Sequence, residues 1–579
     1  MLNKAPSLNE FRIITCLALS TMFILTVGCT NFSGSTDNPQ DARNHLTFEE
    51  LMAEKPPGMV DNKYYMPIKP SDQAPHKLSG TISFSETLMN HQVSKWGYLG
   101  EGQAYFPKFS IPLISHNGHL IPLKRGLIYL YKHKNSIYHV IFSPGSVWRE
   151  PGDKGFSRAS FPFTLTDNFE GISRSGLATF VYNESTISKV AVQISQDNAP
   201  KGQHLQANFD GLVIARYLPG KITDEDATIG AFNQELSRRL KIHSWRELKD
   251  GDSLHELFNM GLAETDISIA ALVLDGEIYL QPPVTRSGIY PYPESMRTGV
   301  YSATKSLAAG LSMFFLAEKY GEGVFDEQIT DYVTGLAKHP GWKGVTFAHT
   351  LNMATGVRGS DGPKDINSFI ITPSAKYKLR AINRLEDKPP APGEKFAYAT
   401  TNSFVLSYAI NQYVKSKEGD DADLWQMVER DVLRPIGIFH FPILRTKERK
   451  GQLGVPLMGL ASFPNVDEAA KIALLLQNDG QYQGRQLLNR NKVRQALNKT
   501  EWPGYEAGRN RRYQHSFWLY PNLKGGDCIF KLSSMSGRGG HYIAFYPKNI
   551  IAIRFADAMN YNLQYMSSAV GQIRNLCGN

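Results

Sequence analysis

The stretch that decides the fold is Tyr301-Ser302-Ala303-Thr304-Lys305-Ser306, which leads into the mostly apolar run Leu307–Leu316. The spacing of apolar residues predicts a buried helix from Ser302 to Tyr320, ended by Gly321. Residues three apart on a helix share one face, so Ser302 and Lys305 are expected to lie side by side. No other Ser-x-x-Lys occurs in the chain.

This pair has the residue types of an activated nucleophile. A serine hydroxyl attacks poorly until a neighbouring base takes its proton, and a lysine can serve as that base when it is buried. At the helix start, Ser302 also lies in the positive end of the helix dipole, which favours a developing alkoxide. The motif alone leaves open a capping serine beside a solvated lysine. An apolar helix argues against that alternative, because a buried lysine needs a partner or a function.

Further motifs follow in a fixed order: Val345–Gly356, the Pro-Gly turn in Pro392–Tyr398, and Met458–Leu488. Together with Tyr301–Ser306 they resemble the beta-lactamase-related serine hydrolases of the class C type, over about residues 250–560. That family also includes D,D-peptidases, esterases and nylon-oligomer hydrolases. The resemblance implies an antiparallel sheet flanked by helices, with an all-helical lobe beside it.

The resemblance implies that the Tyr398 phenol relays the proton between Ser302 and Lys305, as general base and then acid. A packed tyrosine with a satisfied hydroxyl is the alternative. The family often carries Asn two places later, where this chain has Thr400, whose hydroxyl can donate to a substrate carbonyl or contact Lys305. Asn402 is a second candidate for substrate contact.

The third landmark is expected at Ser536–His541, which precedes a strand. Here the N–H of His541, with that of Ser302, is expected to form the oxyanion hole. Substrate contacts are assigned to Arg538, Gly539 and Gly540. A guanidinium suits carboxylates bidentately, and the run Gly-x-Gly-Gly-x-Tyr-Ile is nearer the nylon-oligomer hydrolase and esterase branch than true beta-lactamases. An ordinary glycine loop is the alternative.

The N-terminus has the pattern of an export signal. Lys4 and Arg12 precede the apolar run Ile13–Val27, which ends at Gly28-Cys29. This resembles a lipoprotein signal peptide over residues 1–29 with Cys29 lipidated, and Thr30 points to a periplasm-facing outer-membrane lipoprotein. An uncleaved anchor or a plain secretory signal is the alternative. Residues 30–75 are predicted to be a flexible tether.

Two domains are predicted after the tether. Short β-branched and aromatic runs, including a hairpin over Gly126–Phe142 and a strand at Gly211–Arg216, predict an all-β, sandwich-like domain at 76–222. Residues 223–579 then mix helices with strands near both ends, which predicts an α/β hydrolase domain whose terminal strands share one antiparallel sheet. The role of the β domain is open.

Composition narrows the functional classes. The net charge of +9 is spread along the chain, which argues against a nucleic-acid partner. No Cys-x-x-Cys or His-Glu-x-x-His occurs, so no metal and no cofactor are expected. Of four cysteines, Cys528 and Cys577 fall in the mature body and are a possible disulfide in an oxidising compartment.

The leading hypothesis is a serine hydrolase that cleaves an ester or amide through an acyl-enzyme on Ser302, with Lys305 and Tyr398 as proton-relay groups. Its substrate is expected to be a small-molecule or oligomeric ester or amide, with the membrane as a partner through the lipid anchor. The alternative is a non-catalytic, lipid-anchored cell-envelope binding protein that keeps the penicillin-binding scaffold. The sequence leaves the acyl group open.

Overall fold

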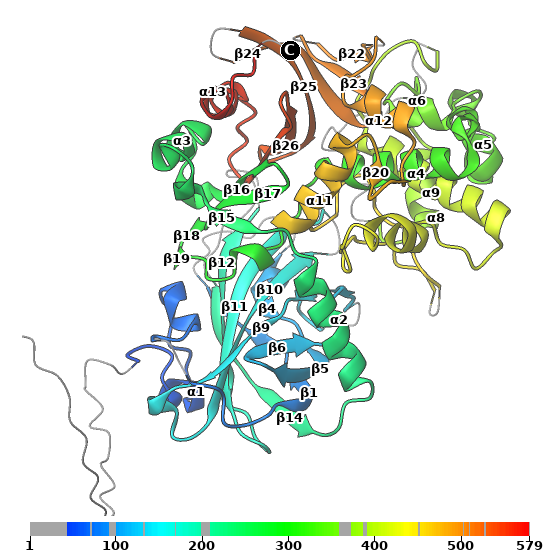
Figure 1. Ribbon diagram of the computed structural model, residues 1–579. Coiled ribbons are helices and arrows are strands. Elements are labelled where there is room, and N and C mark those ends of the chain that lie inside the picture. Colours follow the sequence, from blue (N-terminus) through cyan, green and yellow to red (C-terminus); the bar gives the residue numbers. More distant parts are fainter. Residues whose placement is uncertain are drawn as a thin grey trace, which may run out of the picture. The chain divides into compact units, whose positions relative to one another are not determined.

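The computed structural model describes residues 43–69, 72–91, 100–130, 134–167, 170–198, 209–357, 372–385, 391–449, 452–501, 503–508, 510–525 and 528–577. An all-β domain comes first and a larger α/β domain follows (Figure 1). The predicted signal peptide, with Cys29, lies outside the described residues. None of the described helices is both long and apolar enough to cross a membrane.

The all-β domain is built on one continuous sheet of 12 strands in the order β14-β1-β5-β6-β9-β10-β11-β12-β13-β3, with β8 on β10 and β7 on β8. Phe84 of β1 and Val192 of β12 meet in one buried cluster although their strands are far apart in this order. The sheet therefore curls around its own core rather than forming two separate sheets. The all-β prediction is confirmed, including the hairpin of β7 and β8, whereas the predicted strand Gly211–Arg216 divides at Ile214 between β13 and β14.

The strands of this domain are β1 (Ser79–Phe84), β2 (Thr87–Leu88), β3 (Asn90–His91), β4 (Tyr105–Phe106), β5 (Phe109–His116), β6 (His119–Pro122), β7 (Leu127–Ile128), β8 (Tyr138–Phe142), β9 (Gly145–Arg149), β10 (Ser157–Asp167), β11 (Ser173–Tyr182), β12 (Val190–Asp197), β13 (Phe209–Val213) and β14 (Ala215–Pro219).

The segment before β1 is folded against this sheet. Helix α1 (Phe48–Met52) begins with a capping box in which the Thr47 side chain accepts from the N–H of Glu50 and the Glu50 carboxylate accepts from the N–H of Thr47. Leu51 and Tyr65 are buried on the outer face of β11. The predicted flexible tether is therefore wrong for residues 43–69, because apolar residues scattered among polar ones bind this segment to the sheet.

The α/β domain has a nine-stranded sheet in the order β15-β17-β16-β27-β26-β25-β24-β23-β22. Its early strand β16 pairs antiparallel with its last strand β27, as predicted from the sequence. Helices α3 and α13 cover one face, while α11 and the helix that follows Ser302 cover the other (Figure 1).

The strands are β15 (Ile242–Ser244), β16 (Ile267–Leu274), β17 (Glu277–Gln281), β22 (Tyr505–Glu506), β23 (Arg512–Gln514), β24 (Phe517–Gly525), β25 (Cys528–Gly537), β26 (His541–Tyr546) and β27 (Ile550–Ala556), with the small pairs β18 (Val284–Thr285) and β19 (Gly288–Ile289), and β20 (Gln481–Tyr482) and β21 (Arg485–Gln486). The helices are α2 (Glu225–Ser237), α3 (Gly251–Phe258), α4 (Leu311–Tyr320), α5 (Ile329–Tyr332), α6 (Phe347–Leu351), α8 (Ala375–Ile382), α9 (Thr400–Glu418), α10 (Leu424–Val428), α11 (Val466–Gln477), α12 (Arg490–Ala496) and α13 (Gln564–Ile573).

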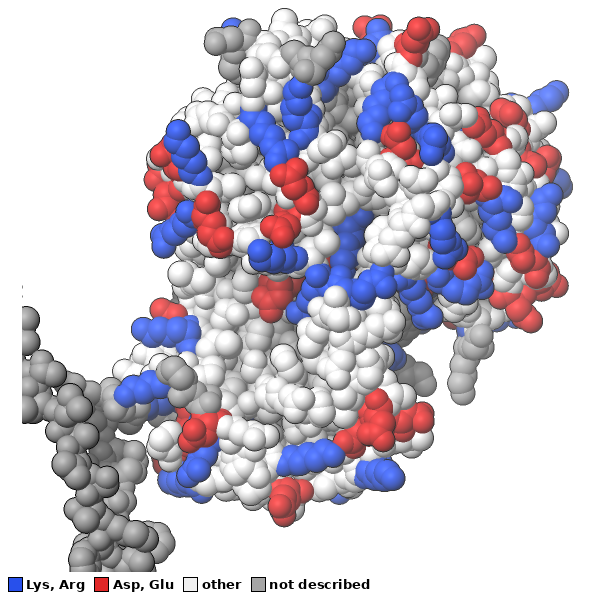
Figure 2. Space-filling model, in the orientation of Figure 1, with Lys and Arg blue, Asp and Glu red and all other residues white. Residues whose placement is uncertain are grey.

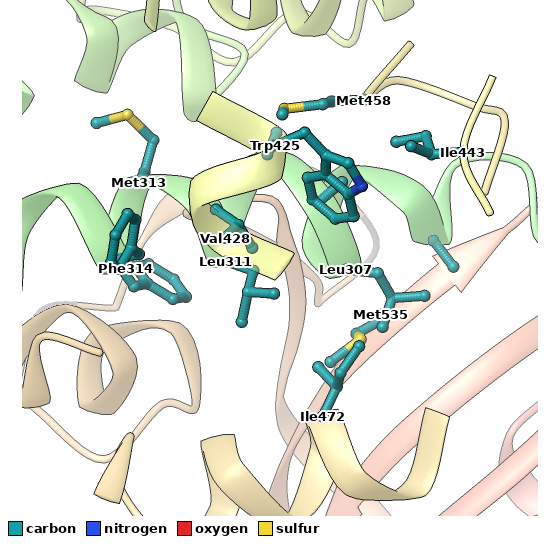
Figure 3. Close-up of a cluster of buried hydrophobic side chains, with 14 of the residues drawn as sticks. Leu307, Leu311, Met313, Phe314, Trp425, Val428, Ile443, Met458, Ile472 and Met535 are labelled. Atoms are coloured by element: carbon teal, nitrogen blue, oxygen red, sulfur yellow. The ribbon is translucent and has the colours of Figure 1, made fainter. Parts of the chain in front are cut away.

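The helix after Ser302 runs through the centre of the hydrophobic core. Leu307 and Leu311 meet side chains from the helical lobe, from α11 and from the sheet, represented by Trp425, Ile472 and Met535 (Figure 3). Its first part, Lys305–Gly310, is a π-helix that continues into α4. Because apolar contacts surround this helix, its start is held rigidly.

The two domains share a buried cluster, in which Leu127 and Ile141 of the β domain lie with Ile269 of β16, and an ion pair of 3.1 Å between Arg286 and Asp197. Phe232 of α2 packs on Ile114 and Ile121 of the β sheet, so α2 belongs with the β domain and the predicted boundary at residue 222 is too early. Near the C-terminal end of α2, the Arg125 guanidinium donates two hydrogen bonds to the Glu235 carboxylate, from Nη1 and Nη2. Figure 2 shows Lys and Arg side chains gathered along this junction beside Asp and Glu.

Cys528 and Cys577 form a disulfide, with 5.6 Å between their Cα atoms. The bond joins the first residue of β25 to the segment after α13. The predicted pairing is confirmed.

Candidate active site

The chain reaches Ser302 through a tight turn. Tyr301 has a φ of +44°, a left-handed conformation that is uncommon for a bulky residue. Three successive N–H groups then donate to the carbonyl three residues back, ending with Lys305 N to Ser302 O at 3.0 Å. In a helical turn of this kind residues i and i+3 eclipse each other, which places the Ser302 and Lys305 side chains one above the other.

The Lys305 amine is buried, with 1% of the residue exposed. Its Nζ lies 2.9 Å from Ser302 Oγ, 3.2 Å from Thr400 Oγ1 and 2.7 Å from the carbonyl oxygen of Gly459. The carbonyl can only accept, so it fixes one N–H of the amine and orients the rest toward the two hydroxyls. The structure therefore brings together Ser302, Lys305 and Thr400 as the sequence predicted.

The Tyr398 ring lies against the amine, with Lys305 Nζ 5.0 Å from the ring centroid. On its other sides the ring is stacked on Trp518, with centroids 5.8 Å apart, and meets Tyr513 edge-on at 6.1 Å. Phe396 completes this group, which we call the aromatic wall: Phe396, Tyr398, Tyr513 and Trp518. Sequence reasoning missed Tyr513 and Trp518, because they come from β23 and β24, more than a hundred residues later in the chain.

Tyr398 is positioned by the loop after α6. The N–H of Gly393 donates to Ala354 O and the N–H of Ala397 donates to Met353 O, both at 2.7 Å. A Cβ at Gly393 would lie 2.8 Å from His349 Nε2, and the φ of this glycine is +86°. The Pro-Gly turn is thus required for close approach. Two motifs that the sequence shows only in order are bonded to each other here.

Thr400 and Asn402 both lie in the first turn of α9 but point to different partners. Thr400 contacts the Lys305 amine, whereas the Asn402 amide donates to Thr355 Oγ1 at 3.3 Å. Asn402 is 1% exposed. Its contact with Thr355 joins α9 to the loop after α6, so in this structure the amide supports the site rather than facing a substrate.

The end of β25 borders the turn that carries Ser302. A Cβ at Gly537 would lie 2.1 Å from Val300 O and 3.2 Å from the nitrogen of Ala303. The ladder between β24 and β25 ends at the pair of Trp518 and Ser534, so the last residues of β25 run past β24 with one edge open. Alternate N–H groups of this edge are available to a ligand.

His541 does not supply an oxyanion-hole N–H, and that prediction is wrong. The residue stands opposite Gly537, and β26 is an interior strand between β25 and β27. Backbone N–H groups of such a strand point in the plane of the sheet at its two neighbours. Ser536 and Gly537 belong to the predicted landmark but were given no role in it, and the absence of a side chain at Gly537 was the available signal.

Gly539 and Gly540 pack closely against the segment after β27, and their substrate contact stays a prediction. A Cβ at either glycine would lie 2.5 Å from a backbone oxygen of the segment after β27, Ala556 O for Gly539 and Asn560 O for Gly540. Both have positive φ, as a tight turn between β25 and β26 requires. Arg538, between Gly537 and these glycines, is half-buried and makes no hydrogen bond or ion pair with any other described residue.

The His541 side chain is neutral at pH 7. Burial, aided by the nearby charge of Arg554, lowers the pKa of His541 to about 3. Its Nδ1 accepts from the N–H of Ala556 at 3.2 Å, and its ring stacks on Tyr301 with centroids 5.9 Å apart. His541 therefore supports Tyr301. Over the described ranges, no group of three or more His, Cys, Asp or Glu side chains is arranged to hold a metal ion.

A serine in contact with a buried lysine, beside a tyrosine ring at the edge of an antiparallel sheet, is the residue set expected of a serine hydrolase. The chain belongs to the beta-lactamase family, since the family model described as Beta-lactamase matches residues 269–571. The family predicted from the motifs is confirmed, and the α/β domain has the fold of these serine hydrolases. A search of curated proteins found no match.

The chain is similar to solved structures that include three with different descriptions. A protein described as a 6-aminohexanoate-dimer hydrolase from Bacillus anthracis is 16% identical over 54% of this chain and 78% of its own, with a TM-score of 0.42. A penicillin-binding protein homolog from Caulobacter crescentus is 15% identical over 56% and 97%, at 0.42. A family VIII carboxylesterase is 16% identical over 56% and 97%, also at 0.42.

Proposed function

We propose that this protein hydrolyses an ester or amide through a covalent acyl-enzyme on Ser302. The observation that carries the proposal is the 2.9 Å contact between Lys305 Nζ and Ser302 Oγ at a buried amine. General-base action requires the neutral form of Lys305, in which two hydrogens bond Gly459 O and Thr400 Oγ1 and the lone pair faces Ser302 Oγ. That arrangement accepts the serine proton as the hydroxyl attacks.

The first half of the reaction forms the acyl-enzyme. Ser302 Oγ bonds to the carbonyl carbon while its proton moves to Lys305, and the carbonyl oxygen becomes an oxyanion. The N–H of Ser302 and an N–H at the open edge of Ser536–Gly537 stabilise this oxyanion. Tyr398, against the amine, relays the proton to the leaving oxygen or nitrogen as the old bond breaks.

The second half reverses these roles with water. The same base removes a proton from water, the hydroxyl attacks the acyl carbon, and Ser302 leaves with the proton returned to its oxygen. The aromatic wall favours a substrate with an apolar or planar group beside the scissile bond. Arg538 favours one with a carboxylate further along.

A covalent probe tests the assignment. A fluorophosphonate should label the wild type and fail on Ser302→Ala, while Ser312→Ala on the same helix, whose hydroxyl donates to Met458 Sδ at 3.9 Å, keeps wild-type labelling. Lys305→Met should slow labelling by roughly 10²–10⁴-fold, the usual contribution of a positioned base. Labelling of Ser302→Ala at the wild-type rate would refute the nucleophile.

The same experiment tests the non-catalytic alternative. A wild type that no fluorophosphonate labels and that turns over none of a panel of esters, D-amino-acid amides, linear amides and beta-lactams, while binding cell-wall fragments, would support a binding protein. We also propose that Cys29 carries a lipid that holds the protein on the periplasmic side of the outer membrane. Incorporation of a labelled fatty acid, lost in Cys29→Ala, is the expected result.

A further inference from the structure

Side chains of the β domain form hydrogen bonds with the backbone segment that leads into Ser302. Gly299 lies three residues before the nucleophile, and both of its backbone groups bond to β-domain side chains. Its N–H donates to Ser173 Oγ at 2.9 Å, and its carbonyl accepts from the Asn198 amide. Ser175 Oγ donates to the carbonyl of Arg297 at 3.1 Å in the same way.

The α/β domain holds the alternate residues of this segment. The N–H of Thr298 donates to Pro464 O at 3.3 Å, and the N–H of Val300 donates to Ser462 O at 3.2 Å. The segment therefore runs like a strand between two partners, one from each domain. Removing either partner would leave backbone groups unsatisfied.

The β-domain partner is itself fixed. Asn198 Oδ1 accepts from the N–H of Ser173 at 2.8 Å, and the N–H of Asn198 donates to Ser173 O at 3.2 Å. Ser173 is 2% exposed and Asn198 is 1% exposed. A buried side-chain pair held on both sides makes a rigid support, because neither group can rotate without losing a bond.

No side chain can be accommodated at Gly299. A Cβ there would lie 2.1 Å from Gly171 O and 2.9 Å from Asn198 Nδ2. Two residues after Gly299, Tyr301 packs on Ile172, which follows Gly171 in the β domain. These contacts hold Tyr301 in its left-handed conformation, and that conformation aims Ser302 at Lys305.

We infer that the β domain positions the nucleophile, with Ser173 and Asn198 as positioning residues that act through Gly299. The inference rests on the proposed function. It gives this domain a part in catalysis without any contact with substrate. A displacement of about 1 Å at reacting atoms can slow a reaction by roughly 10²-fold, so even a partial loss of this support should be measurable.

The chain offers a matched control for Ser173. Ser188 is also 2% exposed, and its Oγ also accepts from a backbone N–H, that of Val181, at 3.0 Å. It lies near the opposite end of β11, about 26 Å along the strand from Ser173. Ser173→Ala and Ser188→Ala therefore delete the same group at the same burial, one beside the nucleophile and one far from it.

The test compares these variants by fluorophosphonate labelling rate, kcat and KM on an ester that the wild type cleaves, and thermal unfolding. Ser173→Ala is expected to lower kcat and the labelling rate by roughly tenfold or more with KM within about twofold, because Ser302 is misplaced while the substrate site remains. Asn198→Asp, which keeps the shape and loses the donor to Gly299, should act in the same direction. Ser188→Ala should lower the unfolding temperature with no change in kcat.

Wild-type labelling by Ser173→Ala and Asn198→Asp, or an equal loss of kcat in Ser188→Ala, would overturn the inference alone. A wild type that is neither labelled nor active would overturn the proposed function, and the inference with it.

Discussion

Replacing Gly537 by alanine adds one methyl group at the point where β25 meets the nucleophile turn. The new Cβ would lie 2.1 Å from Val300 O, against an ordinary contact of at least 3.4 Å, so the two must separate by roughly 1.3 Å. The obstacle is backbone on both sides, since Val300 O accepts from the N–H of Ala303 at 3.1 Å and β25 is paired with β26. Neither side can yield by a side-chain rotation.

The separation should reduce both activity and stability. A shift of about 1 Å between the nucleophile and the oxyanion-hole edge predicts a fall in labelling rate of roughly 10²-fold. Overpacking of this kind destabilises by about 1–3 kcal/mol. The labelling rate with a fluorophosphonate and the urea unfolding midpoint measure the two effects separately.

A second glycine provides the control. A Cβ at Gly145 of β9 would lie 1.9 Å from Ser160 O, a clash of the same kind inside the β domain. Gly145→Ala should therefore lose as much stability as Gly537→Ala while its labelling rate stays near that of the wild type. A normal labelling rate in Gly537→Ala, or an equal fall in Gly145→Ala, would refute the reasoning.

Two further predictions concern stability. Burial raises the pKa of Glu235, but the attraction and hydrogen bonds of Arg125 outweigh it and lower the value from 4.5 to about 2. The resulting stabilisation, about 3 kcal/mol, is complete above pH 4.5 and is lost as the pH falls toward 2. Glu235→Gln should remove it at pH 7 and flatten the acid limb of urea unfolding curves; an unchanged acid limb would contradict the assignment. The disulfide of Cys528 and Cys577 spans a sequence separation of 49 residues, and chain entropy predicts that reduction destabilises by about 4 kcal/mol. Reductant and Cys528→Ser should lower the unfolding midpoint equally, and an unchanged midpoint after confirmed reduction would contradict this.

The apolar pattern of the chain was enough to predict the all-β domain, the α/β domain and the helix after Ser302. These predictions follow from local periodicity, because an apolar face is visible in the sequence whichever element buries it. The segment 43–69 was misread because its few apolar residues, such as Leu51 and Tyr65, have no regular spacing. Their burial depends on the outer face of β11, which no local pattern reveals.

The sequence by itself determined the candidate pair: Ser302 and Lys305 are three residues apart, and any helical turn places them together. The residues that surround this pair could be identified only from the tertiary structure. Whether His541 or the end of β25 borders Ser302 depends on strand order, since only a strand with an open edge has N–H groups to offer. The support of Gly299 by Ser173 and Asn198 likewise joins residues 126 and 101 positions apart, through two domains that pack on each other. Spacing along the chain fixes local contacts, whereas contacts between distant segments are decided by which surfaces become buried together.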